Sequence, residues 1–79
     1  AAAEQRLARW RTAVAQPAGP AAEPVLEQVR AALRTDLDAP SALAAIDRWA
    51  ESCLAGDQPD AAAPALISAV ADALLGISL

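Results

Sequence analysis

The sequence contains no histidine, lysine, tyrosine, phenylalanine or methionine, and it has one cysteine among its 79 residues. Histidine and lysine supply many of the general bases, Schiff-base amines and phosphate-binding cations of enzymes. Its three glycines do not form a glycine-rich phosphate loop. We therefore expect no catalytic, cofactor-binding or metal-binding residue within this chain.

The single cysteine, Cys53, excludes an internal disulfide. Without histidine it also excludes a Cys/His zinc site within one chain. Because Cys53 shares a predicted apolar helical face with Ile46 and Ala50, we interpret it as a core thiol rather than a reactive or metal-ligating one.

Long apolar runs are also missing, since none approaches the roughly 18 residues that a membrane span requires. Charges interrupt the amino-terminal stretch AAAEQRLARW, so it reads as a helix rather than a signal peptide. The net charge is −4 and all cations are arginines, which is not the basic footprint of a nucleic-acid binder. We expect a cytoplasmic protein that binds neither membrane nor nucleic acid.

The composition that is present favours an all-α fold. The chain is 56% hydrophobic but only 3% aromatic, and alanine, the best helix former, supplies most of the apolar residues. A length of 79 residues allows one domain with a small core. The mean hydropathy is positive, which reflects either the alanine content or a face that another domain covers.

Proline and glycine divide the chain into four amphipathic segments. The first covers about residues 2–16 and ends at QPAGP, and the second covers about residues 22–37. The third follows Asp38 and ends before Gly56, and the fourth follows Asp60, as a possible cap, and extends to Ile77. Short connections between them predict a small antiparallel four-helix bundle that forms a single domain of residues 1–79.

The stretch RTDLDAPSALAAIDRWA has the features of a helix start. Asp38 is placed as an N-cap, and Pro40 lies where its missing N–H has no cost. Asp36 and Asp38 both favour the positive end of the helix dipole, so we interpret them as capping residues rather than as a catalytic carboxylate pair.

The fourth segment provides the first candidate for contact with a partner. Its larger apolar residues are predicted to share one core face: Leu66, Ile67, Val70, Leu74 and Ile77. Leu75 falls off this face, towards Ser68 and Asp72. We therefore predict that Leu75 docks onto another protein surface.

Trp10 and Trp49 flank the apolar faces of their helices. We interpret both as core residues with the indole N–H turned outward, and contact with a base or a partner is the alternative.

The arginines form two pairs along the predicted helices. Arg30 and Arg34 lie one turn apart on the second helix, and Arg6 and Arg9 lie together on the first. Solvated pairing with Glu27 or Glu4 is the leading interpretation, and contact with phosphate or a partner is the alternative.

The stretch VRAALRTDLDAPSALAAIDRWA, residues 29–50, resembles the helical C-terminal region of the cysteinyl-tRNA synthetase superfamily. RLARWRTAV near the start and ADALLGISL at the end resemble one branch more closely, the cysteine:glucosaminyl-inositol ligases of actinobacterial mycothiol biosynthesis. Leu37 and Asp38 replace the aromatic residue and asparagine that are common in the synthetases, and no basic anticodon-reading extension follows Leu79.

This resemblance implies a C-terminal fragment of a larger enzyme whose catalytic domain uses ATP and zinc to activate cysteine. The family's catalytic and zinc motifs have no matching position here, so the implied role is to pack on that catalytic domain. Two alternatives remain: the tRNA-contacting domain of a cysteinyl-tRNA synthetase, with Arg6, Arg9, Arg30 and Arg34 on phosphates, or a free-standing helical interaction module. Exposed apolar surface would also allow a homodimer.

Overall fold

The computed structural model describes the backbone of residues 2–36 and 39–79 and the side chains of residues 4–34 and 40–79. This part of the chain forms four α-helices, namely α1 (Ala2–Val14), α2 (Glu23–Asp36), α3 (Ala39–Leu54) and α4 (Ala63–Leu75). The all-α class predicted from the sequence is confirmed, and each predicted segment contains one helix.

The start of α3 agrees with the sequence interpretation as far as it is described. Pro40 is the second residue of the helix, where the backbone nitrogen has no intrahelical acceptor to lose. The predicted N-cap, Asp38, lies outside the described residues. Gly56 follows the helix with a φ of 106°, a conformation that favours glycine.

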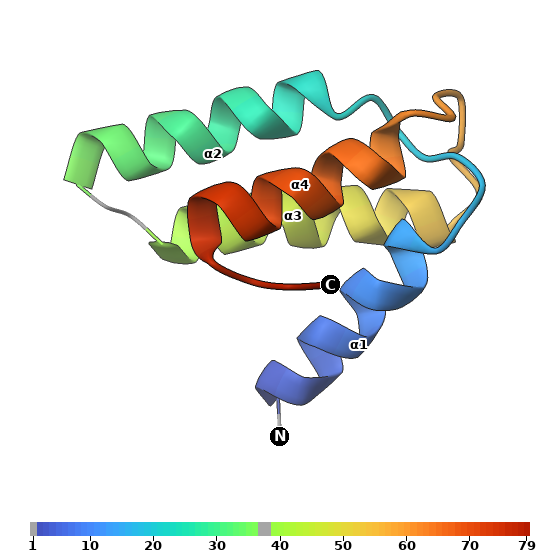
Figure 1. Ribbon diagram of the computed structural model, residues 1–79, viewed down its shortest axis with the longest axis horizontal. Helices are drawn as coiled ribbons and strands as arrows, with labels where there is room; N and C mark the ends of the chain where they lie inside the picture. The colour runs from blue at the N-terminus through green and yellow to red at the C-terminus, as the bar shows by residue number, and fades with distance from the viewer. Residues whose placement is uncertain (1, 37–38) are drawn as a thin grey trace.

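The longest helix is α3, at 16 residues, and it packs between α1 and α2. Figure 1 shows that α2, α3 and α4 run in alternating directions while α1 crosses them obliquely. α1 and α2 each pack against both α3 and α4. The paired α2 and α3 extend beyond the C-terminal end of α4 (Figure 1). In the described part of the chain, no helix combines the length and apolar character needed to cross a bilayer.

Alanine is the commonest residue in the core, which allows the helices to approach closely. The buried hydrophobic residues are Trp10, Ala13, Ala22, Val25, Val29, Ala42, Ala45, Ile46, Trp49, Ala50, Cys53, Ala63, Ile67, Val70 and Ala71. Leu54, at the C-terminal end of α3, lies outside this core and is 42% exposed. The core of small side chains expected from the composition is present.

The buried face of α4 differs from the predicted one. Leu66 and Leu74 are 44% and 37% exposed, although both were predicted to face the core. Leu75, predicted to point away, is half-buried and packs against the core. Leu66 is turned away from the contact face of α4, which includes the fully buried small residues Ala63 and Ala71 that a leucine-weighted prediction overlooks. Leu74 lies on the same side of the helix as these alanines but remains partly uncovered.

Both ends of α4 also differ from the prediction. The helix begins at Ala63, and the Asp60 carboxylate accepts a hydrogen bond of 2.9 Å from the Ala62 N–H in the preceding turn rather than capping the helix. Gly76 ends the helix in the left-handed conformation with a φ of 68°. The N–H of Ile77 then donates back to the Ala71 carbonyl at 3.0 Å, which places Ile77 beyond the helix and against the core.

The α1–α2 and α3–α4 connections lie together and pair through two backbone hydrogen bonds. The Gly19 N–H donates to the Asp60 carbonyl at 2.9 Å, and the Asp60 N–H donates to the Gly19 carbonyl at 3.0 Å. Gly19 is buried against Trp49, and a Cβ at this position would lie 2.6 Å from the indole carbon Cζ2. Glycine is therefore required here by close packing.

We predict that Gly19→Ala lowers the free energy of unfolding by about 2 kcal/mol because the added methyl group must displace the Trp49 indole. Urea unfolding followed by tryptophan fluorescence measures this change. The matched control is Gly76→Ala, where no atom crowds the new methyl group and only the left-handed backbone costs about 1 kcal/mol. An unchanged unfolding midpoint for Gly19→Ala would contradict the packing argument.

Candidate docking surface

Trp10 is fully buried and joins α1 to α3. Its Nε1–H donates a hydrogen bond of 2.7 Å to Oδ1 of Asp47 on α3. The other carboxylate oxygen of Asp47 forms an ion pair of 3.1 Å with Arg6. The core interpretation of Trp10 is confirmed, but its N–H faces a protein acceptor rather than solvent. A buried and bonded indole supports the core interpretation over the alternative of contact with a base or a partner.

Trp49, on α3, is also a buried tryptophan whose indole N–H has a protein acceptor. It is 3% exposed, and its Nε1–H donates a hydrogen bond of 2.7 Å to the Pro20 carbonyl in the α1–α2 connection. The core interpretation of Trp49 is therefore also favoured over the alternative of contact with a base or a partner. The sequence contains no direct signal for either acceptor, because both lie far from their tryptophan along the chain.

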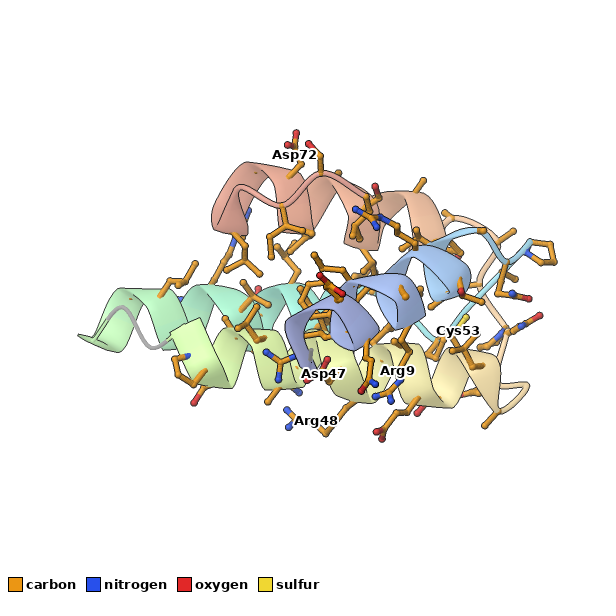
Figure 2. All side chains as sticks on the ribbon, turned by 90° about the horizontal axis from the view of Figure 1, so that it is seen from below. Arg9, Asp47, Arg48, Cys53 and Asp72 are labelled. Carbon is orange, nitrogen blue, oxygen red and sulfur yellow. The ribbon has the colours of Figure 1, made fainter. Side chains whose placement is uncertain are left out.

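The first arginine pair binds to α3 rather than to a glutamate on a neighbouring turn. Arg9 lies 3.9 Å from Glu51, and Arg6 pairs with Asp47. Figure 2 shows Arg9 and Asp47 on the side where α1 crosses α3. Both arginines therefore have carboxylate partners on α3, which their spacing along the first helix does not predict.

We predict that Asp47→Ala destabilises the domain by about 1–3 kcal/mol because it leaves the buried Trp10 N–H without an acceptor. Asp47→Asn is the matched control: it keeps the side-chain oxygen for Trp10, loses only a half-exposed ion pair and should cost less than about 1 kcal/mol. Thermal unfolding measured for both variants separates the two effects. Equal losses would show that the ion pair, and not the indole hydrogen bond, matters.

Cys53 is a buried thiol, as the sequence predicts. Its Sγ lies 3.6 Å from the Ala13 carbonyl oxygen and 3.5 Å from that of Ala18, so it bridges α3 to the end of α1. Burial, with a smaller contribution from the charge of Asp57, raises its pKa above the ordinary value of 9.0. The thiol is thus held in its protonated, unreactive form.

This raised pKa makes stability fall in alkaline solution. The protonated Cys53 thiol contributes fully to the free energy of unfolding below pH 9.0, where the thiol is protonated in both the folded and the unfolded chain. This contribution is lost as the pH rises through the higher pKa of the folded state, because the unfolded chain loses its proton first. We predict that the unfolding free energy declines over this range and that Cys53→Ala removes this part of the decline. The same pH dependence in the variant would contradict the assignment.

The described residues do not fit the zinc site that the family resemblance implies for the parent enzyme. No group of three or more histidine, cysteine, aspartate or glutamate side chains in this part of the chain is placed to hold a metal ion. Cys53 is also enclosed by backbone carbonyls rather than by other ligands. No chemical step is therefore assigned through a metal bound here.

One partly apolar surface lies between α2 and α4, and we call it the α2–α4 groove. It consists of two adjoining hollows of about 480 and 210 Å³ that share Arg30 and Leu74. The residues that define it are Leu26, Arg30, Leu33, Arg34, Leu66 and Leu74. The groove therefore brings Arg30 and Arg34, the possible partner contacts, together with Leu66 and Leu74, whose helical spacing predicts a core position.

Leu75 does not line this groove. It follows Leu74 by one residue, about 100° further around the helix, and packs against the core. The prediction that Leu75 points away from the core is therefore wrong, whereas its docking role stays a prediction that this position does not support.

A third hollow, of about 420 Å³, lies between α1, α3 and the C-terminal tail. Its apolar walls are Leu7, Leu43 and Ile77, which are all partly buried and pack against the core. It lacks the strongly exposed leucines of the α2–α4 groove, which is therefore the better candidate for contact with another surface.

A helical fold with an exposed apolar groove is typical of an accessory domain that packs on another part of a protein. No protein-family model matches the chain. It is 58% identical, over all 79 residues, to the L-cysteine:1D-myo-inositol 2-amino-2-deoxy-alpha-D-glucopyranoside ligase of Streptosporangium roseum, and it covers 19% of that protein.

Two further ligases of the same name show similar agreement. The identity is 59% over 78 residues, or 98% of the chain, in Thermomonospora curvata, and 54% over 79 residues, or 100% of the chain, in Streptomyces griseus. The chain spans about a fifth of the length of these curated relatives. It belongs to the family of these cysteine ligases and corresponds to their C-terminal part.

Proposed function

We propose that this chain is the C-terminal helical domain of an ATP-dependent ligase that joins L-cysteine to glucosaminyl-inositol in mycothiol biosynthesis. The observation that carries this proposal is the 58% identity over all 79 residues to a ligase with that cysteine and amino-sugar acceptor in its name. The reaction, with its ATP and zinc, belongs to the remainder of the protein, which we place in the cytoplasm.

Within that enzyme, residues 1–79 form one domain that packs on the catalytic part and keeps the arrangement of an antiparallel four-helix bundle. The chemistry of the described side chains supports a structural role. Cys53 is buried with a raised pKa, and both tryptophans are enclosed. The acidic residue that contacts Trp10, Asp47, is occupied by the indole and by Arg6. These groups serve the fold and are not presented to a substrate.

The test uses the full-length gene product that contains this chain. With ATP, L-cysteine and glucosaminyl-inositol, we expect a cysteinyl amide of the amino sugar, detected by mass spectrometry. Deleting the region of residues 1–79 should lower the melting temperature of the remaining enzyme, because apolar surface that the domain covers becomes exposed. The deletion should also remove at least part of the ligase activity.

Two controls make this experiment decisive. tRNA offered in place of glucosaminyl-inositol should accept no cysteine, and a cysteinylated tRNA would identify a synthetase instead. A truncated enzyme with unchanged activity and melting temperature would contradict a supporting role for the domain. A wild-type protein that forms no amide would contradict the assigned reaction.

A further inference from the structure

The apolar core of the domain continues into an open surface at the C-terminal end of α4. Leu74 follows the buried Ile67, Val70 and Ala71 at spacings of seven, four and three residues, so it lies on the same side of the helix. It is nevertheless 37% exposed, whereas Ile67 and Ala71 are fully buried. Leu74 thus shares the buried side of α4 but is not fully covered by another helix. We infer that a surface outside this chain covers it.

The walls around Leu74 are apolar on both sides. Leu33 on α2 is partly buried against the core and meets Leu74 in the larger hollow. Leu26 lies with Leu66 in the smaller hollow, and Leu66 is 44% exposed. Apolar side chains are the groups that gain most from entering such a surface, because they leave water on binding.

The rim of the α2–α4 groove carries positive charge. Arg30 and Arg34 lie one turn apart on α2, and both are exposed. Among the residues whose side chains the structure describes, neither has an ion-pair partner, whereas Arg6 and Arg9 are paired with α3. The guanidinium group matches the geometry of a carboxylate, so the rim favours acidic side chains on whatever enters the groove.

The apolar walls and the two arginines favour one kind of surface as the partner that covers the groove. The relatives are about five times as long as the part that this chain matches, so the remaining four fifths of the ligase offer a tethered surface. A second copy is disfavoured because a two-fold contact would bring one arginine-rimmed patch against another. The net charge of −4 and the apolar walls are equally unsuited to nucleic acid.

We propose that the α2–α4 groove is the surface by which this domain docks on the rest of its own ligase chain. Apolar side chains of the catalytic region fill the space beside Leu66 and Leu74, and carboxylates of that region pair with Arg30 and Arg34. This inference rests on the proposed function, which supplies the occupant.

The experiment measures how well the groove is covered in the full-length protein. Leu66, Leu74 and Leu54 are each replaced by cysteine, one at a time. The rate of maleimide labelling is measured in the native protein and in urea, and fragmentation mass spectrometry assigns the label to its residue. Leu54 is the matched control because it is 42% exposed in this domain, close to the 37% of Leu74, and lies outside the groove.

We expect the cysteines at positions 66 and 74 to react at least about tenfold more slowly than the one at position 54, after normalisation to the rates in urea, because docking restricts access to the thiol. Equal rates at the three positions would overturn the inference. Protection that disappears on dilution would assign the groove to a second copy and would also overturn it.

The charged rim is tested in the protein that carries Leu74→Cys. Arg30→Glu together with Arg34→Glu should restore fast labelling at position 74, because carboxylates would then face carboxylates. Arg11→Glu, a charge reversal at an exposed position on α1, should leave the protection intact. Protection that survives the double reversal would overturn the pairing with carboxylates.

Ligase activity, measured separately on the wild-type protein, distinguishes this inference from the proposed function. An active ligase with an unprotected groove overturns the docking surface alone. A protected groove in a long protein without ligase activity overturns the assigned reaction alone. A gene product of only these 79 residues would overturn both, because no occupant would exist.

Discussion

The rest of the fold depends on how the two buried indole N–H groups are satisfied. Trp10 and Trp49 are the only aromatic residues in the chain, and an indole in an alanine-rich core must find an acceptor for its N–H. Trp10 reaches Asp47 on α3, and Trp49 on α3 reaches the Pro20 carbonyl. Both hydrogen bonds involve α3, so they set where α1 and the α1–α2 connection lie against it. The close approach at Gly19 follows from the second of these bonds.

This arrangement closes one side of the domain and leaves another open. Where α1 crosses α3, the Asp47 carboxylate, Arg6 and the buried thiol of Cys53 complete the contact. Between α2 and α4, among the side chains that the structure describes, no indole joins the two helices, and Leu66 and Leu74 remain partly in water. This open side, which also carries Arg30 and Arg34, is therefore the surface that we propose contacts the larger part of the ligase.

The sequence predicts the arginines of the α2–α4 groove but not its exposed leucines. Arg30 and Arg34 could be selected from the sequence because their spacing places them on one side of a helix. Leu66 and Leu74 could not, because their spacing alone is that of core residues, and Leu75 was selected in their place. Helical periodicity reports which residues share a face, but it does not report whether a neighbouring helix is long enough, or close enough, to cover that face.

The sequence by itself determined the helical class, the approximate extent of the four helices, the buried character of Cys53 and the relationship to the cysteine ligases. These properties follow from local signals such as alanine content, proline and glycine positions and short stretches of similar residues. Only the tertiary structure decided the rotation of α4, the acceptors of both indoles and the partners of Arg6 and Arg9. Each of these depends on which residues meet across helices distant in the chain, and small alanine side chains let several rotations satisfy the same pattern until the neighbouring helices select one.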